Sequence, residues 1–326
     1  MQKAPAQRRQ SPFDNLVAAD RSRRVVIAGG AGFLGRALAR TLVQEGREVV
    51  ILSRRPAPGV GLIRTVVWDG RTVGDWAGEL ESATAVVNLT GRSVACLYTP
   101  ENRREIMASR IDSVRAIAQA CERCREPPPV LVQASSLAIY GDPGDRVCDE
   151  TSPHGTGFGV EICESWEGAF FGGDDPGGAR RVALRIGFVL GRDGGALVQL
   201  AKLARWFIGG AAGSGRQCLS WLHLDDFCAM VCWAIENPAA QGAYNATGSA
   251  PVTNAEFMRA LRAALGRPWS PPTPVWAVKL GARFVMGVDS SLALGGRRCV
   301  PQRLLEEGFV LLHTDLDATL RELLAK

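Results

Sequence analysis

Three glycines near the N-terminus form the pattern in this chain that is most directly tied to chemistry. They lie in the heptapeptide Gly29-Gly30-Ala31-Gly32-Phe33-Leu34-Gly35, which follows an apolar run over residues 25–28 and opens a helix-like stretch. We expect Gly29 to permit a tight turn, Gly32 to let the backbone approach a diphosphate, and Gly35 to let the helix pack closely. Free N–H groups at the start of the helix would hold the anion. The spacing predicts a dinucleotide-binding turn, with a purely structural turn as the alternative.

The end of the second apolar run indicates which dinucleotide would bind. An NAD site usually places an Asp or Glu there, whereas this chain has Ser53, Arg54 and Arg55. A hydroxyl and a guanidinium suit a 2′-phosphate, so we expect Ser53 and Arg54 to contact NADP. The alternative is that both arginines are simply solvated.

The elements that would position these residues alternate along the chain. Apolar runs predict strands over residues 25–28, 49–52, 65–69, 85–91, 130–134 and 182–190, and helical spacing predicts helices over 103–123 and 160–171. Such alternation is typical of an α/β protein with a doubly wound parallel Rossmann sheet.

The second half of the chain alternates less regularly. Helices are expected over residues 196–207, 224–237, 276–286 and 316–324, around a glycine-rich loop at 209–215. We therefore predict a disordered tail over 1–22, a Rossmann domain over 23–245, and a smaller, mostly helical C-terminal substrate lobe over 246–326.

Composition excludes several classes of protein. The chain has 326 residues, 46% of them hydrophobic, and a formal charge of +5, of which +4 falls in the first 24 residues. The nearly neutral remainder argues against a nucleic-acid partner. The sequence has neither a secretory signal nor a membrane-spanning stretch, so we expect no membrane partner. Nine scattered cysteines fit a reducing, cytoplasmic compartment, and the Cys121/Cys124 pair lacks a second pair for a metal site.

Beyond the glycine turn, ordered short motifs extend along the chain. They are Asn88-Leu89-Thr90-Gly91, Ser109-Arg110-Ile111, Ala134-Ser135-Ser136, Tyr140-Gly141-Asp142, Trp166-Glu167, residues 213–217, residues 220–223, residues 251–254, Val300-Pro301 and Glu307-Gly308-Phe309. From about Arg24 onward, the chain resembles the extended and atypical branch of the short-chain dehydrogenase/reductase superfamily, which contains sugar-nucleotide epimerases and dehydratases. More narrowly, it is similar to an NADP-binding epimerase-family subgroup with its own C-terminal domain, here at about 272–322.

The resemblance implies a set of cofactor contacts in addition to the glycine turn, Ser53 and Arg54. These further positions are Leu89, Thr90, Gly91, Glu105, Arg110, Arg185, Gly187 and Val189. For Arg110, an alternative is a salt bridge on the helix face with Glu105 or Asp112. The resemblance also implies pairing into a homodimer through the two helices at 103–123 and 160–171.

The main departure from the superfamily is at its catalytic pair. Most members use Tyr-x-x-x-Lys to move a proton as hydride moves to or from the nicotinamide. Here the corresponding positions hold Phe158 and Ile162, and neither side chain exchanges protons. General acid–base help is worth about 10² to 10⁴ in rate, so another group must replace it if the protein turns over.

Three residues are candidates for that role. Ser136 matches the superfamily's active-site serine, although the narrower subgroup usually has alanine there. Tyr140 has suitable chemistry but can equally be a wall of the crevice. Glu161 lies close to Phe158 along the helix, and we expect it to be half-buried with a raised pKa. Cys163 is interpreted as a core residue.

Three further residues are candidates for substrate binding. Arg216 and Gln217 follow a glycine-rich loop and can clamp an anionic substrate, unless they are only solvated. His223 is a candidate base, although a histidine at this helix start can instead satisfy a backbone group. Two functions remain open: an NADP-dependent oxidoreductase or epimerase acting on a small carbonyl or sugar-like substrate, or a non-catalytic NADP-binding or redox-sensing module that acts through a partner.

Overall fold

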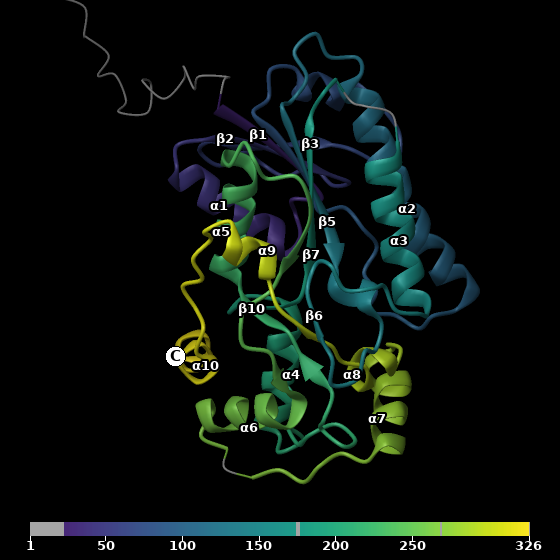
Figure 1. The fold of residues 1–326 in the computed structure, drawn as a ribbon, viewed down its shortest axis with the longest axis vertical. Coiled ribbons are helices and arrows are strands. Elements are labelled where there is room, and N and C mark those ends of the chain that lie inside the picture. The colour runs from purple at the N-terminus through teal and green to yellow at the C-terminus, as the bar shows by residue number, and fades with distance from the viewer. Residues whose placement is uncertain (1–22, 174–176, 268, 326) are drawn as a thin grey trace, which may run out of the picture.

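A seven-stranded sheet forms the centre of the protein in a computed structural model that describes residues 23–173, 177–267 and 269–325 (Figure 1). All neighbouring strands are parallel, in the order β11-β7-β5-β4-β1-β2-β3. Their bounds are β1 Arg24–Ala28, β2 Glu48–Ser53, β3 Ile63–Val67, β4 Ala85–Asn88, β5 Val130–Ser136, β7 Arg180–Ile186 and β11 Gly242–Ala246. The predicted tail over 1–22 lies outside the described residues.

Helices cover both faces of this sheet. The central strand β1 shows why, since all five of its residues are buried and successive side chains point to opposite faces. Val25 and Ile27 join a core cluster with α1 (Phe33–Gln44) and α5 (Leu224–Glu236). Val26 and Ala28 join a second cluster with α2 (Pro100–Cys121) and α3 (Phe158–Gly172). The predicted doubly wound architecture is confirmed.

The strand predicted over residues 182–190 is in fact two strands. β7 ends at Ile186, and β8 (Phe188–Leu190) leaves the main sheet to pair with β10 (Trp221–His223). Gly187 makes this change of direction possible, because a Cβ there would lie 2.5 Å from the Ser220 carbonyl oxygen. The prediction of one continuous strand was therefore wrong.

Other predicted elements differ from the structure in their extent. The third strand begins at Ile63 and ends at Val67, and the fourth ends at Asn88 rather than at residue 91. The helix predicted over 276–286 is a short α7 (Val275–Gly281) followed by a π-helical turn over Ala282–Met286. Strand β11 and helix α6 (Asn254–Ala264) were not predicted at all.

The C-terminal lobe has its own hydrophobic cluster. Trp221, Phe257 and Leu320 pack together there with residues of α4 (Gly195–Arg205) and α10 (Leu316–Leu324). The lobe core thus uses residues on both sides of position 246, and α9 (Gln302–Glu306) returns to pack against β11.

The remaining elements are short. One ladder joins β9 (Cys218–Leu219) to β12 (Val252–Thr253), and another joins β6 (Val147–Cys148) to β13 (Arg298–Cys299). Helix α8 spans Ser291–Leu294. Across the described ranges, no helix combines the length and apolar character needed to cross a membrane.

Candidate functional site

The glycine turn between β1 and α1 has the geometry that the sequence predicts. Gly29 adopts a φ of +74°, which favours glycine over residues that carry a Cβ. A Cβ on Gly35 would lie 2.4 Å from the Gly30 Cα, so only glycine lets the helix approach this closely. Gly32, by contrast, faces open space, because a Cβ there would meet only the Gly29 carbonyl oxygen, at 3.5 Å. The turn is tight where the chain folds back and open where a ligand would approach.

The start of α1 is free to bind an anion. Among the described residues, no side chain caps the helix at Gly32, and its first turn contains no acidic residue. The first N–H groups of such a helix lack intrahelical partners and carry a partial positive charge. Ala31 is exposed and accepts a hydrogen bond from Arg36 Nη1 (2.6 Å), while Leu34 packs against the core.

Phe33 connects the turn to a glycine loop that follows β8. Cβ atoms on Gly191 or Gly194 would lie 2.7 or 2.5 Å from atoms of the Phe33 ring, so the ring packs directly against this loop. The loop therefore requires glycine for packing, and Phe33 fixes its position beside the nucleotide turn.

The end of β2 presents two exposed arginines. The Ser53 hydroxyl accepts a hydrogen bond from the Arg55 N–H (3.3 Å). Neither Arg54 nor Arg55 has an ion-pair partner among the described residues, and both side chains face solvent. A guanidinium that is not already paired can bind a 2′-phosphate at this position.

Three buried polar atoms around the end of β4 lack hydrogen-bond partners within the described chain. They are Thr90 Oγ1, Arg110 Nε and Trp166 Nε1. The Arg110 guanidinium lies 4.8 Å from the Trp166 ring centroid and is so close to Gly91 that a Cβ there would lie 3.1 Å from Arg110 Cζ. Buried polar atoms are nearly always satisfied, so this cluster indicates a polar ligand.

Arg110 does not form the salt bridge that was the alternative for it. Glu105 pairs with Arg71 instead (2.9 Å), and Arg71 also approaches Asp112 (3.9 Å). Arg110 donates to the backbone oxygens of Arg92 and Ile106, and burial lowers the pKa of its guanidinium. Burial without a carboxylate leaves a positive charge that an anionic ligand can neutralise.

Arg185 and Tyr140 meet in a closed polar network rather than in an open crevice. Arg185 forms two hydrogen bonds with the Glu167 carboxylate (3.0 and 2.8 Å) and donates a third to the Tyr140 hydroxyl (2.9 Å). That hydroxyl donates in turn to Asn245 Oδ1 (2.8 Å). Burial raises the pKa of Tyr140 to about 12. Both side chains are buried and use their polar groups in hydrogen bonds within the protein. We therefore assign neither a proton-transfer role to Tyr140 nor a side-chain cofactor contact to Arg185.

The strand register explains why this network forms. Ser135, Arg185 and Asn245 are direct neighbours on β5, β7 and β11, so their side chains share one face. Glu167 reaches them from α3, and the Ser135 hydroxyl donates to it (2.6 Å). The sequence analysis used Glu167 only as a family signature and missed this role, because its partners Ser135 and Arg185 come from two other elements, β5 and β7.

The position of the missing catalytic tyrosine is filled by stacked side chains. The Phe158 ring contacts the Tyr98 ring edge-on, with centroids 5.0 Å apart, and Arg103 Cζ lies 4.3 Å above Phe158. Ile162 is buried one turn further along α3. Burial, with a contribution from Asp289, raises the pKa of Tyr98. Tyr98 was missed because it lies in an irregular segment that gives no periodic signal.

The other proposed proton carriers differ in accessibility. Ser136 is half-buried at the end of β5, where its Oγ accepts from the Ala138 N–H (3.2 Å). Glu161 is exposed, so the expectation that it is half-buried was wrong: the inward face of this helical turn is taken by Ile162 and Cys163. Burial raises the pKa of Cys163 to about 12, which supports its interpretation as a core residue.

Several predicted contact residues have mainly structural surroundings. Leu89 packs against both core clusters, and Val189 pairs with Leu222 in the β8–β10 ladder. The Gln217 amide donates to the backbone oxygens of Ala212 and Ala293. Arg216 is 80% exposed and lies 3.6 Å from Asp145, which is equally exposed. In the described part of the chain, these interactions of Arg216 and Gln217 go to residues 145, 212 and 293, none of which belongs to the glycine turn.

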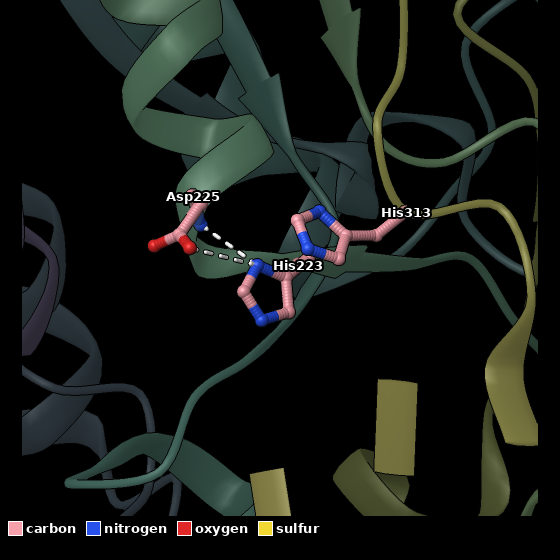
Figure 2. Close-up of side chains that lie close together, drawn as sticks. All are labelled: His223, Asp225 and His313. Atoms are coloured by element: carbon pink, nitrogen blue, oxygen red, sulfur yellow. Dashed lines mark hydrogen bonds and ion pairs between the residues drawn. The ribbon is translucent and has the colours of Figure 1, made fainter. Parts of the chain in front are cut away.

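His223 caps helix α5, as the alternative interpretation proposed. Its Nδ1 accepts the Asp225 N–H (3.0 Å), and its ring stacks on His313 at 3.8 Å (Figure 2). Burial and the neighbouring His313 lower the pKa of His223. Possible ligand atoms of His223, Asp225 and His313 lie within 4.8 Å of one another. The Nδ1 lone pair of His223 forms the cap of α5, and its Nε2 is buried without a hydrogen-bond partner among the described residues, so we describe the group as a helix cap.

Comparison with known proteins identifies two matching regions. Residues 25–159 match the NAD dependent epimerase/dehydratase family, and residues 273–323 match a domain of unknown function, DUF1731. The chain is 34% identical to the epimerase family protein SDR39U1 of Bos taurus over 309 residues, which cover 93% of this chain and 100% of the relative. It is 31% identical to the Arabidopsis thaliana protein "Epimerase family protein SDR39U1 homolog, chloroplastic", with 92% and 86% covered.

Solved structures show the same likeness. The crystal structure of human epimerase family protein SDR39U1 (isoform 2) with NADPH has a TM-score of 0.82 and 32% sequence identity, covering 92% of this chain and 98% of that one. A nucleoside-diphosphate sugar epimerase from Corynebacterium glutamicum has a TM-score of 0.72 at 26% identity, with 94% and 59% covered.

Proposed function

Because the chain belongs to the NAD-dependent epimerase/dehydratase family, in the group that also carries a DUF1731 domain, we propose that it is an NADP-dependent oxidoreductase or epimerase. Its substrate would be a small carbonyl or sugar-like compound. The observation that carries the proposal is the open glycine turn beside three unsatisfied buried polar atoms. The NADPH-bound crystal structure of the human relative supports the choice of cofactor.

The residues present fit NADP. The N–H groups at the start of α1 would hold the diphosphate, Arg54 would hold the 2′-phosphate, and Thr90 with Arg110 would bind polar groups beyond the end of β4. Bound NADP would supply hydride transfer at its nicotinamide ring. The chain itself must orient the substrate and carry the proton that accompanies the hydride.

Tyr98 is the strongest candidate for that proton carrier. Its ring packs on Phe158, at the position where related enzymes hold their tyrosine, and its side chain is half-buried. The positive charges of Arg110 and Arg103 act on Tyr98 and favour its phenolate, which partly opposes the effect of burial on its pKa. Ser136, half-buried at the end of β5, would donate a hydrogen bond to the substrate oxygen.

A second function is favoured by Phe158 and Ile162. Both replace proton-active residues, which is the change expected in a module that binds NADP without turnover and acts through a protein partner. Such a module would keep the open glycine turn and Arg54, and it would not depend on the Tyr98 hydroxyl.

Incubation of the pure protein with NADPH and a panel of aldehydes, ketones and nucleotide sugars tests the proposal. If the protein is an enzyme, at least one carbonyl compound should be reduced while NADPH is oxidised. The Tyr98→Phe variant should then lose about 10²- to 10⁴-fold in rate, with its NADPH affinity unchanged. Micromolar NADPH binding without turnover of any substrate would favour the module. Activity that appears only in the double variant Phe158→Tyr/Ile162→Lys would show that the native site lacks acid–base chemistry.

The remaining proposals concern compartment and partners. Nine unpaired cysteines, seven of them buried in strands or helices, support a reducing, cytoplasmic compartment. We propose no nucleic-acid partner, because the net charge of the chain after residue 24 is close to zero. A homodimer through α2 and α3 remains a prediction, which sedimentation would test.

A further inference from the structure

The end of the C-terminal lobe farthest from β1–β3 carries an unusual density of exposed aromatic residues. Trp206 is 79% exposed, Trp269 68%, Trp276 70% and Phe284 73%. We call this surface, together with Phe207 and Leu280, the aromatic face; it lies along the segments at the lower end of the molecule in Figure 1. Large apolar side chains clustered in this way usually mark an interaction site.

The segments that form the aromatic face run side by side. Ser270 Oγ donates to the Phe207 carbonyl oxygen (2.7 Å), and the Arg267 guanidinium lies 4.8 Å from the Phe207 ring centroid. Thr273 exchanges backbone hydrogen bonds with Ala211 and Gly213, both at 2.8 Å. These contacts place the loop after α4, which follows Trp206 and Phe207, beside the segment that contains Trp269 and leads into α7.

Helix α7 has the pattern of a helix that needs a partner. Trp276 and Leu280 in α7, and Phe284 in the π-helical turn that follows it, are spaced four residues apart, with Lys279 and Arg283 directly before the last two. All residues of α7 are described by the structure, and none of them is buried. The protein's own core thus gives this helix little stabilisation.

The charge of the aromatic face is of one sign. Residues 257–288 contain five basic residues and no acidic one, and Lys202 and Arg205 lie in the last turn of α4, directly before Trp206. A second copy of the chain placed on this face would bring like charges together, which disfavours self-association. An anionic partner would be attracted instead.

We propose that the aromatic face binds the surface of a membrane that contains anionic lipids, without crossing it. Tryptophan and phenylalanine favour the level of the lipid headgroups, and lysine and arginine are drawn to anionic lipids. The sequence-based expectation of no membrane partner rested on the lack of a spanning segment, and surface binding does not require one.

Flotation of the full-length protein with lipid vesicles tests this proposal. We expect binding to phosphatidylcholine vesicles that contain phosphatidylglycerol, little binding to phosphatidylcholine alone, and release at high salt. The double variant Lys279→Glu/Arg283→Glu should weaken binding by at least about tenfold. A matched control with the same change of net charge is Arg123→Glu/Arg125→Glu, two exposed arginines after α2, which should bind like the native protein.

The apolar contribution is tested separately. Trp276→Ser/Phe284→Ser should weaken vesicle binding and reduce the blue shift of tryptophan emission that vesicles cause in the native protein. Val310→Ser, at a residue that is 73% exposed elsewhere, should change neither. Failure to bind anionic vesicles at low salt would overturn the proposal. So would equal loss of binding in the control variants, or a face variant that changes only the sedimentation coefficient, since the face would then join copies of the chain.

Discussion

The nucleotide turn and the Glu167–Arg185 network lie at the same edge of one sheet and are built in opposite ways. The turn uses glycine and backbone N–H groups, and the neighbouring Thr90, Arg110 and Trp166 each have a buried polar atom without a partner among the described residues. The network uses long polar side chains and satisfies them with one another. An open set of donors is suited to bind a ligand, whereas a closed set holds elements together. Polar atoms are buried in both regions, and those beside the turn differ from those of the network in lacking hydrogen-bond partners among the described residues.

The largest effect on stability is expected from a substitution in the Glu167–Arg185 network, which we call the closed region. Glu167→Ala leaves the Arg185 guanidinium buried without its carboxylate, which should cost about 3–5 kcal/mol in the free energy of unfolding. Urea denaturation measures this loss. Asp145→Ala, at a pair in which both side chains are 80% exposed, should leave the urea midpoint unchanged. If both variants unfold at the same urea concentration, the network does not stabilise the fold.

The glycine turn, with the end of β2 beside it, is called the open region. A substitution there should change cofactor binding rather than stability. Arg54→Ala removes a charge-assisted contact worth about 1.5–3 kcal/mol, so the preference for NADP over NAD should fall roughly ten- to a hundredfold. Isothermal titration with both cofactors measures the ratio. Because the side chain is exposed, the melting temperature without cofactor should not move. An unchanged ratio of affinities would remove Arg54 from the site.

Two glycines of the same turn allow a finer comparison. Gly35→Ala places a Cβ 2.4 Å from the Gly30 Cα, so the turn must open, at a cost of about 1–3 kcal/mol in stability. Gly32→Ala meets only the Gly29 oxygen at 3.5 Å, so it should leave stability unchanged and weaken NADPH binding. Thermal unfolding and NADPH titration of both variants separate the effects. Equal destabilisation by the two substitutions would contradict these roles.

The sequence predicts the open region well because glycines at this spacing have few structural roles. Gly29 and Gly35 each report a backbone requirement that is local to the β1–α1 connection, and the flanking apolar runs fix the surrounding elements. The doubly wound sheet follows from the same local signals.

The closed region could not be predicted, because its interactions are not local. Tyr140 and Arg185 are attractive site residues until Asn245 and Glu167 are placed beside them, and Asn245 lies on a strand that the sequence did not reveal. Strand β11 is short and contains glycine and asparagine, so only its pairing with β7 makes it a strand. Likewise, the exposure of Glu161 depends on which face of α3 turns inward.

The smallest expected effect concerns His223 at the end of β10, which combines features of both regions: its Nδ1 accepts the Asp225 N–H, while its Nε2 is buried without a hydrogen-bond partner among the described residues. Burial and His313 lower its pKa below the ordinary value of 6.5, while Asp225, Glu322 and Asp226 partly oppose this shift. The unfolded chain therefore takes up a proton as the pH falls through about 6.5, before the folded protein does. The stability that this shift contributes is thus fully present above that pH and declines on acidification.

The His223→Asn variant tests this, because asparagine can cap α5 but does not titrate. The melting temperature of the variant should fall less between pH 7.5 and 5.5 than that of the native protein. If His223→Asn kept the native slope, protonation of His223 would not limit stability, and this helix start would tolerate an additional charge.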